Sequence, residues 1–575
     1  MSKNLEKKVF KEVNDIYSYI LTPLQIKKLT NKILNTINNE KYNKPKKISQ
    51  KDILLITYAD TIKSKNKKSL VVLEDFLNKF IKKTINTIHI LPFYPSSSDG
   101  GFSIKDFFKV DKQHGSWKSI KSISNRYKLM IDIVLNHGSS QSNWFKNFLN
   151  TKGEGKDFFY YLDKEVNTSH IIRARSHKLL QKFKTNKGYK YLWCTFSRDQ
   201  IDFDYRNPKV LLMFIKIIKF IMKQGPTIFR LDAVAFLWKR IDSNCVNLDQ
   251  THAIIRLLRI ILSYNKNKCM IVTETNLPFL ENFSYFGRSD EAHIIYNFSL
   301  APLIINTLIK SNSSAFRRWS MSMPPAKNNN CYLNFLATHD GIGLRPLEGI
   351  ISKNNIKKLI APLKSFGAKL TYRKDKDNQL SVYEANISLI DAMAGTINGK
   401  DNFTYDRFFC AHAIMLCFEG IPSFYIHSLF GTRNDYELLK STKIFRSINR
   451  HIYDYDYLKT KIYDSNSHIS KVYNQIIKLI EVRKKQKAFH PNATQYTLNI
   501  SNNFFGLWRQ SIDRKQSIFA ISNITNKKQI LSLDNINLLS MEKWYDLLSL
   551  KEIYIKDKNL TFKPYQTFWI ANNRN

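Results

Sequence analysis

The chain has 575 residues, of which 43% are apolar and 13% aromatic, and this excludes a disordered or coiled-coil protein. A net charge of +43 would suit a polyanion partner. However, Lys is spread over the whole length with only short clusters such as Lys63–Lys68, and no zinc-finger, RRM or helix-turn-helix pattern accompanies it, so we expect no nucleic-acid partner.

Targeting and membrane signals are not expected either. The first ten residues contain no apolar signal-peptide core, and the most apolar run, Val210–Met222, is interrupted by two Lys residues and is shorter than the ~20 residues of a membrane span. The six Cys residues are scattered without a CxxC pair, as is typical of buried free thiols in a reducing compartment. We therefore expect a cytoplasmic protein with no membrane partner, no cofactor and no metal, and we leave a homodimer open.

Short apolar runs follow a polar, helix-forming N-terminal segment. In chain order they are Ile53–Tyr58, Thr87–Pro92, Met130–Asn136, Thr227–Ala233, Met270–Thr275, His293–Phe298, Leu333–His339 and Pro422–His427. Each is continuously apolar, which is typical of a strand buried on both faces of a parallel sheet, and helical patterns lie between most of them. This α/β rhythm predicts a (β/α)8 TIM barrel, although a doubly wound sheet would show the same local pattern.

Two gaps between the predicted strands are too long for a single helix. They follow the third and seventh strands, so both insertions leave from the C-terminal ends of strands, where barrel active sites lie. After residue 487, short alternating runs predict a C-terminal antiparallel β-domain. The expected organisation is a helical N-terminal extension (1–50), a barrel in three parts (51–142, 207–340 and 405–487), an inserted domain B (143–206), an inserted acceptor-loop subdomain (341–404) and a C-terminal β-domain (488–575).

Charged residues at the ends of four predicted strands point to a functional site. They lie in the segments 132–137 (DIVLNH), 229–232 (FRLD), 273–276 (TETN) and 338–341 (THDG). A single acidic residue after a strand is often the N-cap of the next helix. Four such segments on four strands, in order, instead predict side chains that face a common site.

These four segments resemble the signature regions of the α-amylase family, glycoside hydrolase family 13, over about residues 50–480. By this resemblance Asp232 is the nucleophile, Glu274 the general acid/base and Asp340 the transition-state stabiliser. The resemblance also implies that Arg230 orients Asp232 and holds it ionised. His137 and His339 would bind hydroxyls of a glucosyl ring.

The chemistry of a retaining glycosidase agrees with these roles. One carboxylate attacks the anomeric carbon while a second, ~5–5.5 Å away, protonates the leaving oxygen. The attacking group must be anionic, so a neighbouring guanidinium is expected, whereas the acid lies in an apolar strand whose burial would raise its pKa. A third carboxylate can stabilise the oxocarbenium-like charge.

Longer motifs resemble the sucrose phosphorylase subfamily, while the segment 345–350 (RPLEGI), the extra N-terminal segment and the overall length resemble its glucosylglycerate phosphorylase branch. The longer motifs are 91–107 (LPFYPSSSDGGFSIKDF), 134–145 (VLNHGSSQSNWF), 200–208 (QIDFDYRNP), 337–349 (ATHDGIGLRPLEG) and 448–456 (INRHIYDYD). By this resemblance Asp99 and Arg450 clamp the far hydroxyls of the glucosyl unit. Phosphate would then attack the glucosyl-enzyme to give α-glucose 1-phosphate.

The residues that contact phosphate or the acceptor are less well defined by the sequence. Arg345 is the nearest cation to Asp340 along the chain, so it either contacts phosphate or an anionic acceptor, or pairs with Glu348. The segment 383–386 (YEAN) resembles the family's Tyr-Glu-Leu-Asn loop but has Ala for Leu, which leaves the shape of the acceptor site open. Asn136 matches a calcium ligand of many amylases, and here we expect a polar supporting role.

The sequence therefore predicts a retaining phosphorylase acting on a small α-glucoside of the sucrose or glucosylglycerate type. The partners would be that glucoside and inorganic phosphate. An α-glucosidase or transglucosidase using water or sugar acceptors is the alternative on the same carboxylates. A basic binding protein with the barrel as a scaffold is the alternative from another class.

Overall fold

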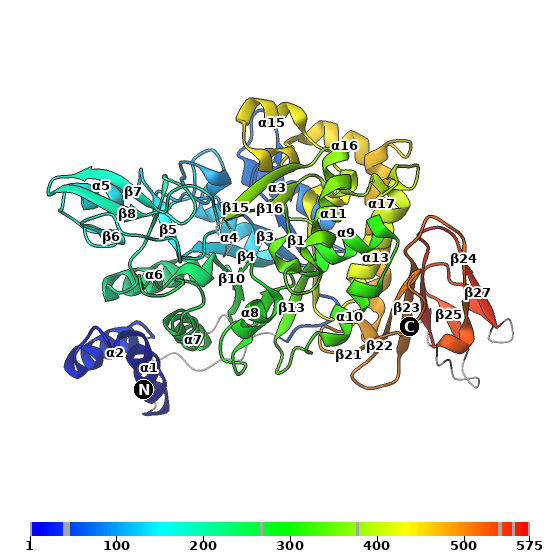
Figure 1. Ribbon diagram of the computed structural model, residues 1–575, viewed down its shortest axis with the longest axis horizontal. Coiled ribbons are helices and arrows are strands. Elements are labelled where there is room, and N and C mark those ends of the chain that lie inside the picture. The colour runs from blue at the N-terminus through cyan, green and yellow to red at the C-terminus, as the bar shows by residue number, and fades with distance from the viewer. Residues whose placement is uncertain are drawn as a thin grey trace.

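The computed structural model describes residues 3–37, 47–264, 268–374, 379–536, 538, 543–554 and 558–572, and a closed barrel forms its centre (Figure 1). The eight barrel strands, in chain order, are β1 (Leu54–Thr57), β3 (Thr87–Ile90), β4 (Lys128–Val134), β10 (Ile228–Asp232), β11 (Met270–Thr273), β12 (Ile294–Tyr296), β13 (Cys331–Phe335) and β19 (Ile421–Tyr425). Neighbouring strands pair in parallel, and β1 closes the ring against β19. The predicted TIM barrel is thus confirmed, and the doubly wound sheet is excluded.

Helices surround the barrel and bury their apolar faces against it. The helices that follow its strands are α3 (Ser69–Phe76), α4 (Trp117–Arg126), α6 (Pro208–Met222), α7 (Asp249–Ser263), α8 (Phe279–Phe283), α9 (Leu300–Lys310), α13 (Thr404–Cys417) and α17 (His468–Lys485). The α6 helix begins where the Asn207 side chain accepts a hydrogen bond from the backbone N–H of Lys209, with Pro208 at the first helical position. Its buried residues recur with helical spacing, which orients the helix on the strands.

The insertion after β4 forms a small domain of its own. It contains α5 (Asn143–Leu149) and a three-stranded antiparallel sheet of β6 (Tyr161–Leu162), β8 (Gly188–Trp193) and β7 (Leu180–Thr185). The chain returns to the barrel through β9 (Gln200–Asp202), which pairs with β5 (His137–Ser139) directly after β4. Both edges of the insertion therefore lie at the C-terminal end of a barrel strand.

The insertion after β13 also carries an antiparallel sheet. Its strands are β14 (Ile342–Gly343), β16 (Leu380–Asn386) and β15 (Lys369–Lys374), with α11 (Lys353–Ser365) between β14 and β15. The two insertions leave from the same end of the barrel and together wall the pocket described below.

The N-terminal segment is a helical hairpin of α1 (Lys3–Tyr17) and α2 (Pro23–Ile37), and residues 38–46 of the expected extension lie outside the described residues. The α1 helix packs on α7 at one side of the barrel (Figure 1). Arg256 Nε donates to Glu12 Oε2 at 2.8 Å, and the Tyr17 hydroxyl donates to the carbonyl of Tyr205 at 3.0 Å. The hairpin is thus fixed to the barrel by polar contacts as well as by apolar packing.

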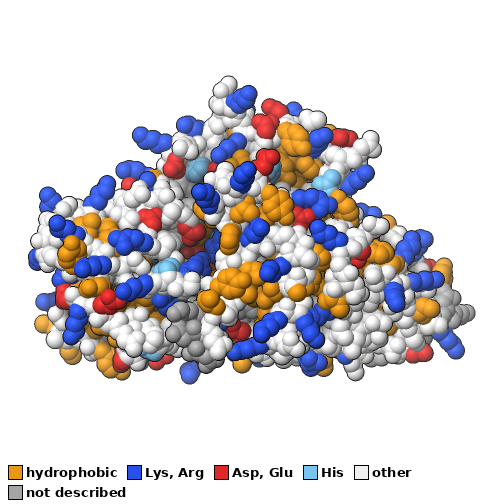
Figure 2. Space-filling model, turned by 45° about the horizontal axis from the view of Figure 1, so that its top comes forward, with side chains coloured by type: hydrophobic (Ala, Val, Ile, Leu, Met, Phe, Trp, Pro, Cys, Tyr) orange, Lys and Arg blue, Asp and Glu red, His pale blue; other side chains and the backbone are white. Residues whose placement is uncertain are grey.

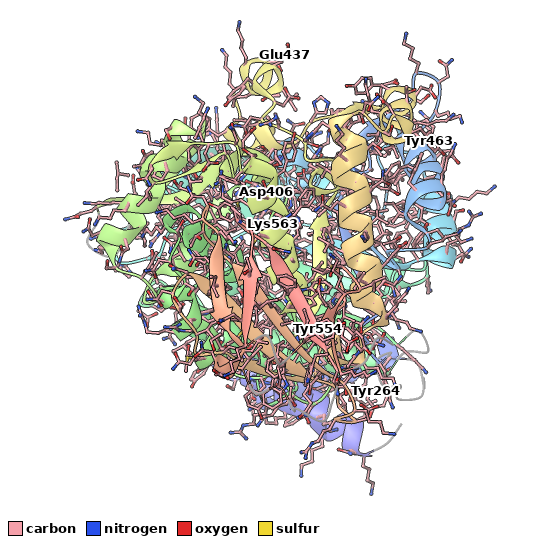
Figure 3. All side chains as sticks on the ribbon, turned by 90° about the vertical axis from the view of Figure 1, so that its right-hand side faces the viewer. Tyr264, Asp406, Glu437, Tyr463, Tyr554 and Lys563 are labelled. Carbon is pink, nitrogen blue, oxygen red and sulfur yellow. The ribbon has the colours of Figure 1, made fainter. Side chains whose placement is uncertain are left out.

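The C-terminal domain is an antiparallel sheet, as predicted. Its strand order is β21 (Thr494–Thr497), β22 (Phe504–Gln510), β23 (Ser517–Asn523), β28 (Thr567–Ala571), β25 (Trp544–Asp546) and β26 (Glu552–Ile553), and Figure 3 shows these strands lying across one side of the barrel. The domain has its own apolar cluster around Phe519, Trp544 and Phe562. Phe505 stacks on Phe316 with ring centroids 4.1 Å apart, so another part of the C-terminal sheet packs into the core of the barrel.

Basic side chains are scattered over the surface. Figure 2 shows Lys and Arg side chains spread over the visible face rather than gathered into one continuous patch. No helix in the described part of the chain has the length and apolar character needed to cross a bilayer.

Candidate active site

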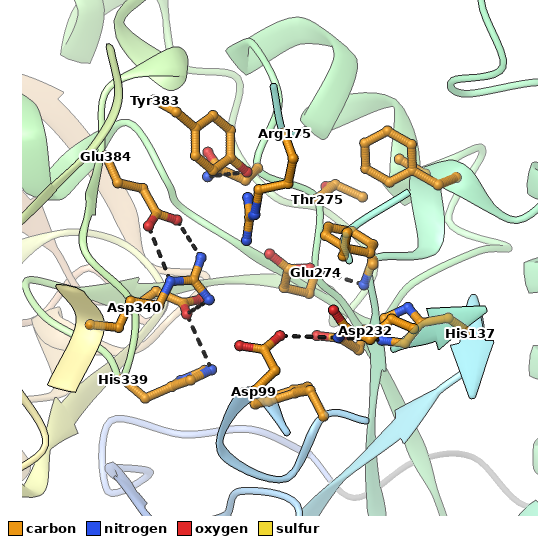
Figure 4. A pocket seen from close by; sticks show the side chains of 18 of the residues that line it. Asp99, His137, Arg175, Asp232, Glu274, Thr275, His339, Asp340, Tyr383 and Glu384 are labelled. Atoms are coloured by element: carbon orange, nitrogen blue, oxygen red, sulfur yellow. Dashed lines mark hydrogen bonds and ion pairs between the residues drawn. The ribbon is translucent and has the colours of Figure 1, made fainter. Parts of the chain in front are cut away.

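A pocket opens at the C-terminal end of the barrel between the two insertions and encloses about 630 Å³ of space that communicates with solvent (Figure 4). All three carboxylates of the predicted set line it, as do seven further titratable side chains. The lining includes Asp232, Glu274, Asp340, Asp99, His137, His339, Glu384, Arg175, Arg446, Gln200 and Tyr383. The barrel thus brings the ends of β4, β10, β11 and β13 together, as the sequence predicted.

Asp232 and Glu274 lie on the neighbouring strands β10 and β11 and are linked through one backbone group. The N–H of Ala233, the residue after Asp232, donates to Glu274 Oε2 at 3.0 Å. Ala233 adopts a left-handed backbone conformation with φ of 50°, which costs about 1 kcal/mol for a residue with a Cβ. This strained turn aims the Ala233 N–H at the carboxylate and fixes Glu274 beside Asp232.

Asp232 is the first member of a buried series of polar contacts that continues through Arg230 and Asp132 to His89. Arg230 Nη1 donates to Asp232 Oδ1 at 2.8 Å and also pairs with Asp132. Asp132 in turn lies 2.7 Å from His89 Nε2. The guanidinium is therefore shared between two carboxylates, and its whole charge is not available to Asp232.

Burial raises the pKa of Asp232 well above its usual range; Arg230 opposes this rise and Glu274 adds to it. Burial likewise raises the pKa of Glu274. The predicted position of Arg230 is correct, but the guanidinium does not reverse the upward direction. The pair therefore binds a proton more readily than isolated carboxyls, and the hydrogen bond from Arg230 favours Asp232 as its anionic member.

Asp340 has the opposite electrostatic environment. Arg446 Nη1 lies 2.5 Å from Asp340 Oδ1, and the same guanidinium makes two hydrogen bonds to Glu384, at 2.6 and 3.1 Å. Although burial opposes it, Arg446 lowers the pKa of Asp340, with smaller contributions from His339 and Arg450. Asp340 is thus held as an anion beside two carboxyl groups that take up protons readily.

One end of the pocket is formed by hydrogen bonds among Asp99, His137 and Gln200, with Arg450 and His339 beside them. Gln200 Nε2 lies 3.0 Å from Asp99 Oδ2 and 3.0 Å from His137 Nε2. Arg450 Nε donates to the carbonyl of His339 at 2.8 Å, and its guanidinium lies against the turn at Gly100, next to Asp99. Burial lowers the pKa of both histidines, to about 3 for His339, so both are neutral.

A lysine ammonium lies beside Asn136. Lys239 Nζ is 3.0 Å from Asn136 Oδ1, 3.1 Å from Asp202 Oδ2 and 2.8 Å from the carbonyl of Phe236. The ammonium therefore joins the end of β4, domain B and the loop after β10. No group of three or more His, Cys, Asp or Glu side chains that could hold a metal ion occurs in the described residues.

The acceptor side of the pocket contains Arg175, which the sequence did not single out. Its guanidinium lies over the rings of Tyr383 and Phe196, at 5.3 and 5.5 Å from their centroids, and its only hydrogen bond among the described residues is to the backbone carbonyl of Ala174. Arg175 belongs to domain B and Tyr383 to the second insertion (Figure 4). The side chain thus bridges the two insertions at the pocket.

Arg345 does not line this pocket. It is buried in the 3-10 helix Arg345–Leu347, where burial and the nearby Arg373 lower its pKa. Glu348 pairs with Arg373, and no Arg345–Glu348 ion pair occurs within the described ranges. The alternative in which Arg345 pairs with Glu348 is therefore not observed, and a contact of Arg345 with phosphate or an anionic acceptor stays a prediction.

Three functional candidates were therefore missing from the sequence prediction: Arg446, Arg175 and Lys239. Arg446 lies just before the INRHIYDYD motif that identified Arg450. Arg175 and Lys239 lie in segments without a recognisable pattern. Only the spatial contacts single them out.

Comparison with known proteins agrees with this geometry. Residues 76–357 match the α-amylase catalytic domain. The chain is 34% identical to glucosylglycerate phosphorylase of Escherichia coli (strain K12), a match that covers 98% of this chain and 100% of that relative. It is 28% identical to sucrose phosphorylase of Streptococcus mutans serotype c, over 70% of this chain and 82% of that relative. The crystal structure of sucrose 6F-phosphate phosphorylase from Thermoanaerobacter thermosaccharolyticum is similar with a TM-score of 0.73 and 23% identity, over 89% of this chain and 98% of that chain.

The barrel, its carboxylate set and these matches show that the chain belongs to the α-amylase family, glycoside hydrolase family 13. Within that family, relatives at 34–37% identity over most of the chain are glucosylglycerate phosphorylases.

Proposed function

We propose that this protein is a retaining α-glucoside phosphorylase that forms α-D-glucose 1-phosphate by double displacement. Asp232 is the nucleophile, Glu274 the general acid/base and Asp340 the stabilising carboxylate. The observation that supports these roles best is the asymmetric placement of cations. Arg230 contacts Asp232, and Arg446 contacts Asp340, whereas the only hydrogen bond to Glu274 among the described residues comes from a neutral backbone N–H.

In the first step an oxygen of Asp232 attacks the anomeric carbon, and the bond from that carbon to the aglycone oxygen breaks. Glu274 gives its proton to that oxygen, so the aglycone leaves as a neutral alcohol and a β-glucosyl ester remains on Asp232. In the second step a phosphate oxygen attacks the same carbon, and Glu274 takes the proton from phosphate. Two inversions give the retained α-configuration of the product.

Asp340 acts on the charge of both transition states. Its anionic form stabilises the positive charge that spreads over the anomeric carbon and the ring oxygen. Asp99, Arg450, His137 and His339 hold the hydroxyls of the glucosyl ring at the closed end of the pocket. This arrangement favours a single terminal glucosyl unit and excludes a polymer that would have to pass through.

Phosphate as the second acceptor is supported by Arg175. A dianion entering beside three carboxyl groups needs a cation that the site has not already neutralised. The Arg175 guanidinium lines the pocket and makes no ion pair with a carboxylate in the part of the chain that the structure describes. The similarity to named phosphorylases over nearly the full length points in the same direction.

D-glycerate is the leaving group that we favour over fructose. Its carboxylate needs the same kind of cation as phosphate, and the two would use Arg175 in successive half-reactions. The relatives that match over most of the chain are named for glucosylglycerate. We place the reaction in the cytoplasm, where phosphate and phosphorylated sugars are available.

The proposal is tested by incubating the enzyme with glucosylglycerate or sucrose, with and without phosphate, and by assaying glucose 1-phosphate and free glucose. Phosphate-dependent glucose 1-phosphate from glucosylglycerate is expected. Release of free glucose at the same rate without phosphate would instead identify an α-glucosidase.

The role of Arg175 is tested with Arg175→Ala. We expect the KM for phosphate to rise by about tenfold or more, because one charge-assisted hydrogen bond is lost, while glucosyl transfer to water persists. Arg198→Ala is the matched control, since Arg198 lies in the same insertion, is exposed and contacts the ring of Phe183 outside the pocket. An unchanged phosphate KM in Arg175→Ala would contradict the assignment.

A further inference from the structure

The side chain of Asp199 is surrounded by serine hydroxyls from two other segments of the chain. Asp199 Oδ2 accepts from Ser97 at 2.5 Å, from Ser98 at 2.5 Å and from Ser103 at 2.8 Å, and Oδ1 accepts from Ser140 at 2.5 Å. Three of these serines belong to the loop after β3, the fourth follows β5, and Asp199 itself precedes β9 of domain B. We call these five residues the serine cradle.

The serine cradle lies directly behind the closed end of the pocket. Ser98 precedes Asp99 in the chain, and Asp199 precedes Gln200. The side chains of Asp99 and Gln200 meet at 3.0 Å, and both line the pocket. The residue before Asp99 is therefore hydrogen-bonded to the carboxylate of the residue before Gln200, so the cradle sets the separation of the two backbones.

The Asp99 backbone needs such support. Asp99 has a φ of 55°, which L-residues rarely adopt, and the two following glycines also have positive φ. A Cβ on Gly100 would lie 2.5 Å from Arg450 Nη1, so this turn is packed tightly against the clamp. The anchored hydroxyls of Ser97 and Ser98 hold the turn on its N-terminal side.

The hydrogen bonds of the serine cradle hold the loop after β3 and the segment after β5 to Asp199 in a fixed geometry. Serine hydroxyls donate to a carboxylate, and hydrogen bonds to an anion are shorter and stronger than neutral ones. Although burial opposes it, the hydrogen bonds from Ser140, Ser97, Ser98 and Ser103 lower the pKa of Asp199. The Asp199 carboxylate therefore keeps its negative charge to lower pH than an isolated aspartate does.

We propose that Asp199 is a positioning residue, which through the serine cradle fixes Asp99 and Gln200 for binding of the glucosyl ring. This inference rests on the proposed function for the identity of the substrate, but its geometry is independent of which acceptor follows. It predicts that loss of the cradle weakens contacts to the glucosyl unit and leaves the phosphate side untouched.

The test is a double-mutant cycle between Asp199→Ala and Asp99→Ala, with kcat/KM for the glucoside, the phosphate KM and Tm measured for each variant. We expect Asp199→Ala to lower kcat/KM for the glucoside by about tenfold, since small displacements of positioning groups have effects of this order. The phosphate KM should stay within about twofold. In the Asp99→Ala background, Asp199→Ala should have a clearly smaller effect on kcat/KM, because only the positioning of Gln200 remains to be lost.

Two further variants keep the test decisive if Asp199→Ala folds poorly. Ser98→Ala removes one hydroxyl from an exposed loop and should show a smaller effect of the same kind, whereas Ser98→Thr keeps the hydroxyl in an extended backbone that suits a β-branched residue and should retain activity. Asp157→Ala is the control in the same insertion, because its carboxylate pairs with Lys209 away from the pocket.

Full additivity of the two Ala variants, or a lower Tm with unchanged kcat/KM, would overturn the positioning role. If the wild type released glucose without phosphate, the proposed function would fail, but the same cycle read by glucose release would still test the cradle.

Discussion

Arg446 Nη1 lies 2.5 Å from Asp340 Oδ1, although the two residues follow different barrel strands, β19 and β13. The same guanidinium is held by Glu384 from the second insertion. One arginine thus connects a carboxylate of the proposed catalytic set to the second insertion.

Replacing Arg446 should therefore weaken the ability of Asp340 to stay anionic and to stabilise positive charge in the transition state. We expect Arg446→Met to lower kcat by about 10²–10³, as for the loss of one stabilising group at a site of developing charge. Because the pKa of Asp340 would rise without its cation, the acidic limb of the kcat profile should also move to higher pH. Arg446→Lys keeps a charge but cannot bind both carboxylates in the same geometry, so its profile should lie between those of Arg446→Met and the wild type.

The roles of Asp232 and Glu274 can be separated by stereochemistry. With a donor that has an activated leaving group and with azide present, Glu274→Ala should yield the α-glucosyl azide, because azide attacks the glucosyl-enzyme. Asp232→Ala should yield the β-azide by a single displacement. Product anomers are assigned by NMR, and an exchanged pattern would reverse the two roles.

Glu274 should reduce stability at neutral pH. Its folded-state pKa is raised from 4.5 by burial, so the folded protein holds this proton to higher pH than the unfolded chain does. Stability from this group is therefore complete below about pH 4.5 and is lost as pH rises through the folded-state pKa. Glu274→Gln should raise Tm at pH 7 by about 1–2 °C, with the gain vanishing toward pH 4.5. A Tm difference that does not change with pH would contradict this.

Lys239 should make domain B independent of added metal. A chelator should leave Tm and activity unchanged, whereas Lys239→Met should cost about 3–5 kcal/mol because Asp202 would remain buried without its cation. Lys209→Met is the control, since the Lys209–Asp157 pair at 2.5 Å is largely exposed and should contribute less than about 1 kcal/mol. Chemical denaturation of the three proteins, with and without chelator, measures these differences.

The barrel and the carboxylate set could be predicted because each corresponds to a pattern within a short stretch of the sequence. A strand buried on both faces is continuously apolar, so Asp232 and Glu274 stand out at the ends of such runs. Two of the cations, which contact Asp340 and domain B, could not be predicted in this way. Arg446 and Lys239 reach their partners only after the chain has crossed the barrel, and no spacing rule connects residues so far apart.

The position of Arg345 in a loop was not predictable from its place in the sequence, and the residue does not line the pocket. Proximity to Asp340 in sequence suggested proximity in space, but the chain passes through β14 and Arg345 then begins a 3-10 helix in which it is buried. Arg175, distant in sequence, takes the position at the pocket instead. Loop conformation depends on packing between the two insertions, which the sequence pattern does not encode.

The closure of β1 against β19 has a consequence for biosynthesis. The chain emerges from the ribosome with Asp232, Glu274 and Asp340 well ahead of Arg446 and Arg450, which follow the last barrel strand. A nascent chain therefore contains Asp340 before it contains Arg446 and Arg450, two of the cations that lower the pKa of Asp340. Ring closure and completion of the pocket's charge coincide, so a chain released before β19 should be neither a closed barrel nor a partly active enzyme.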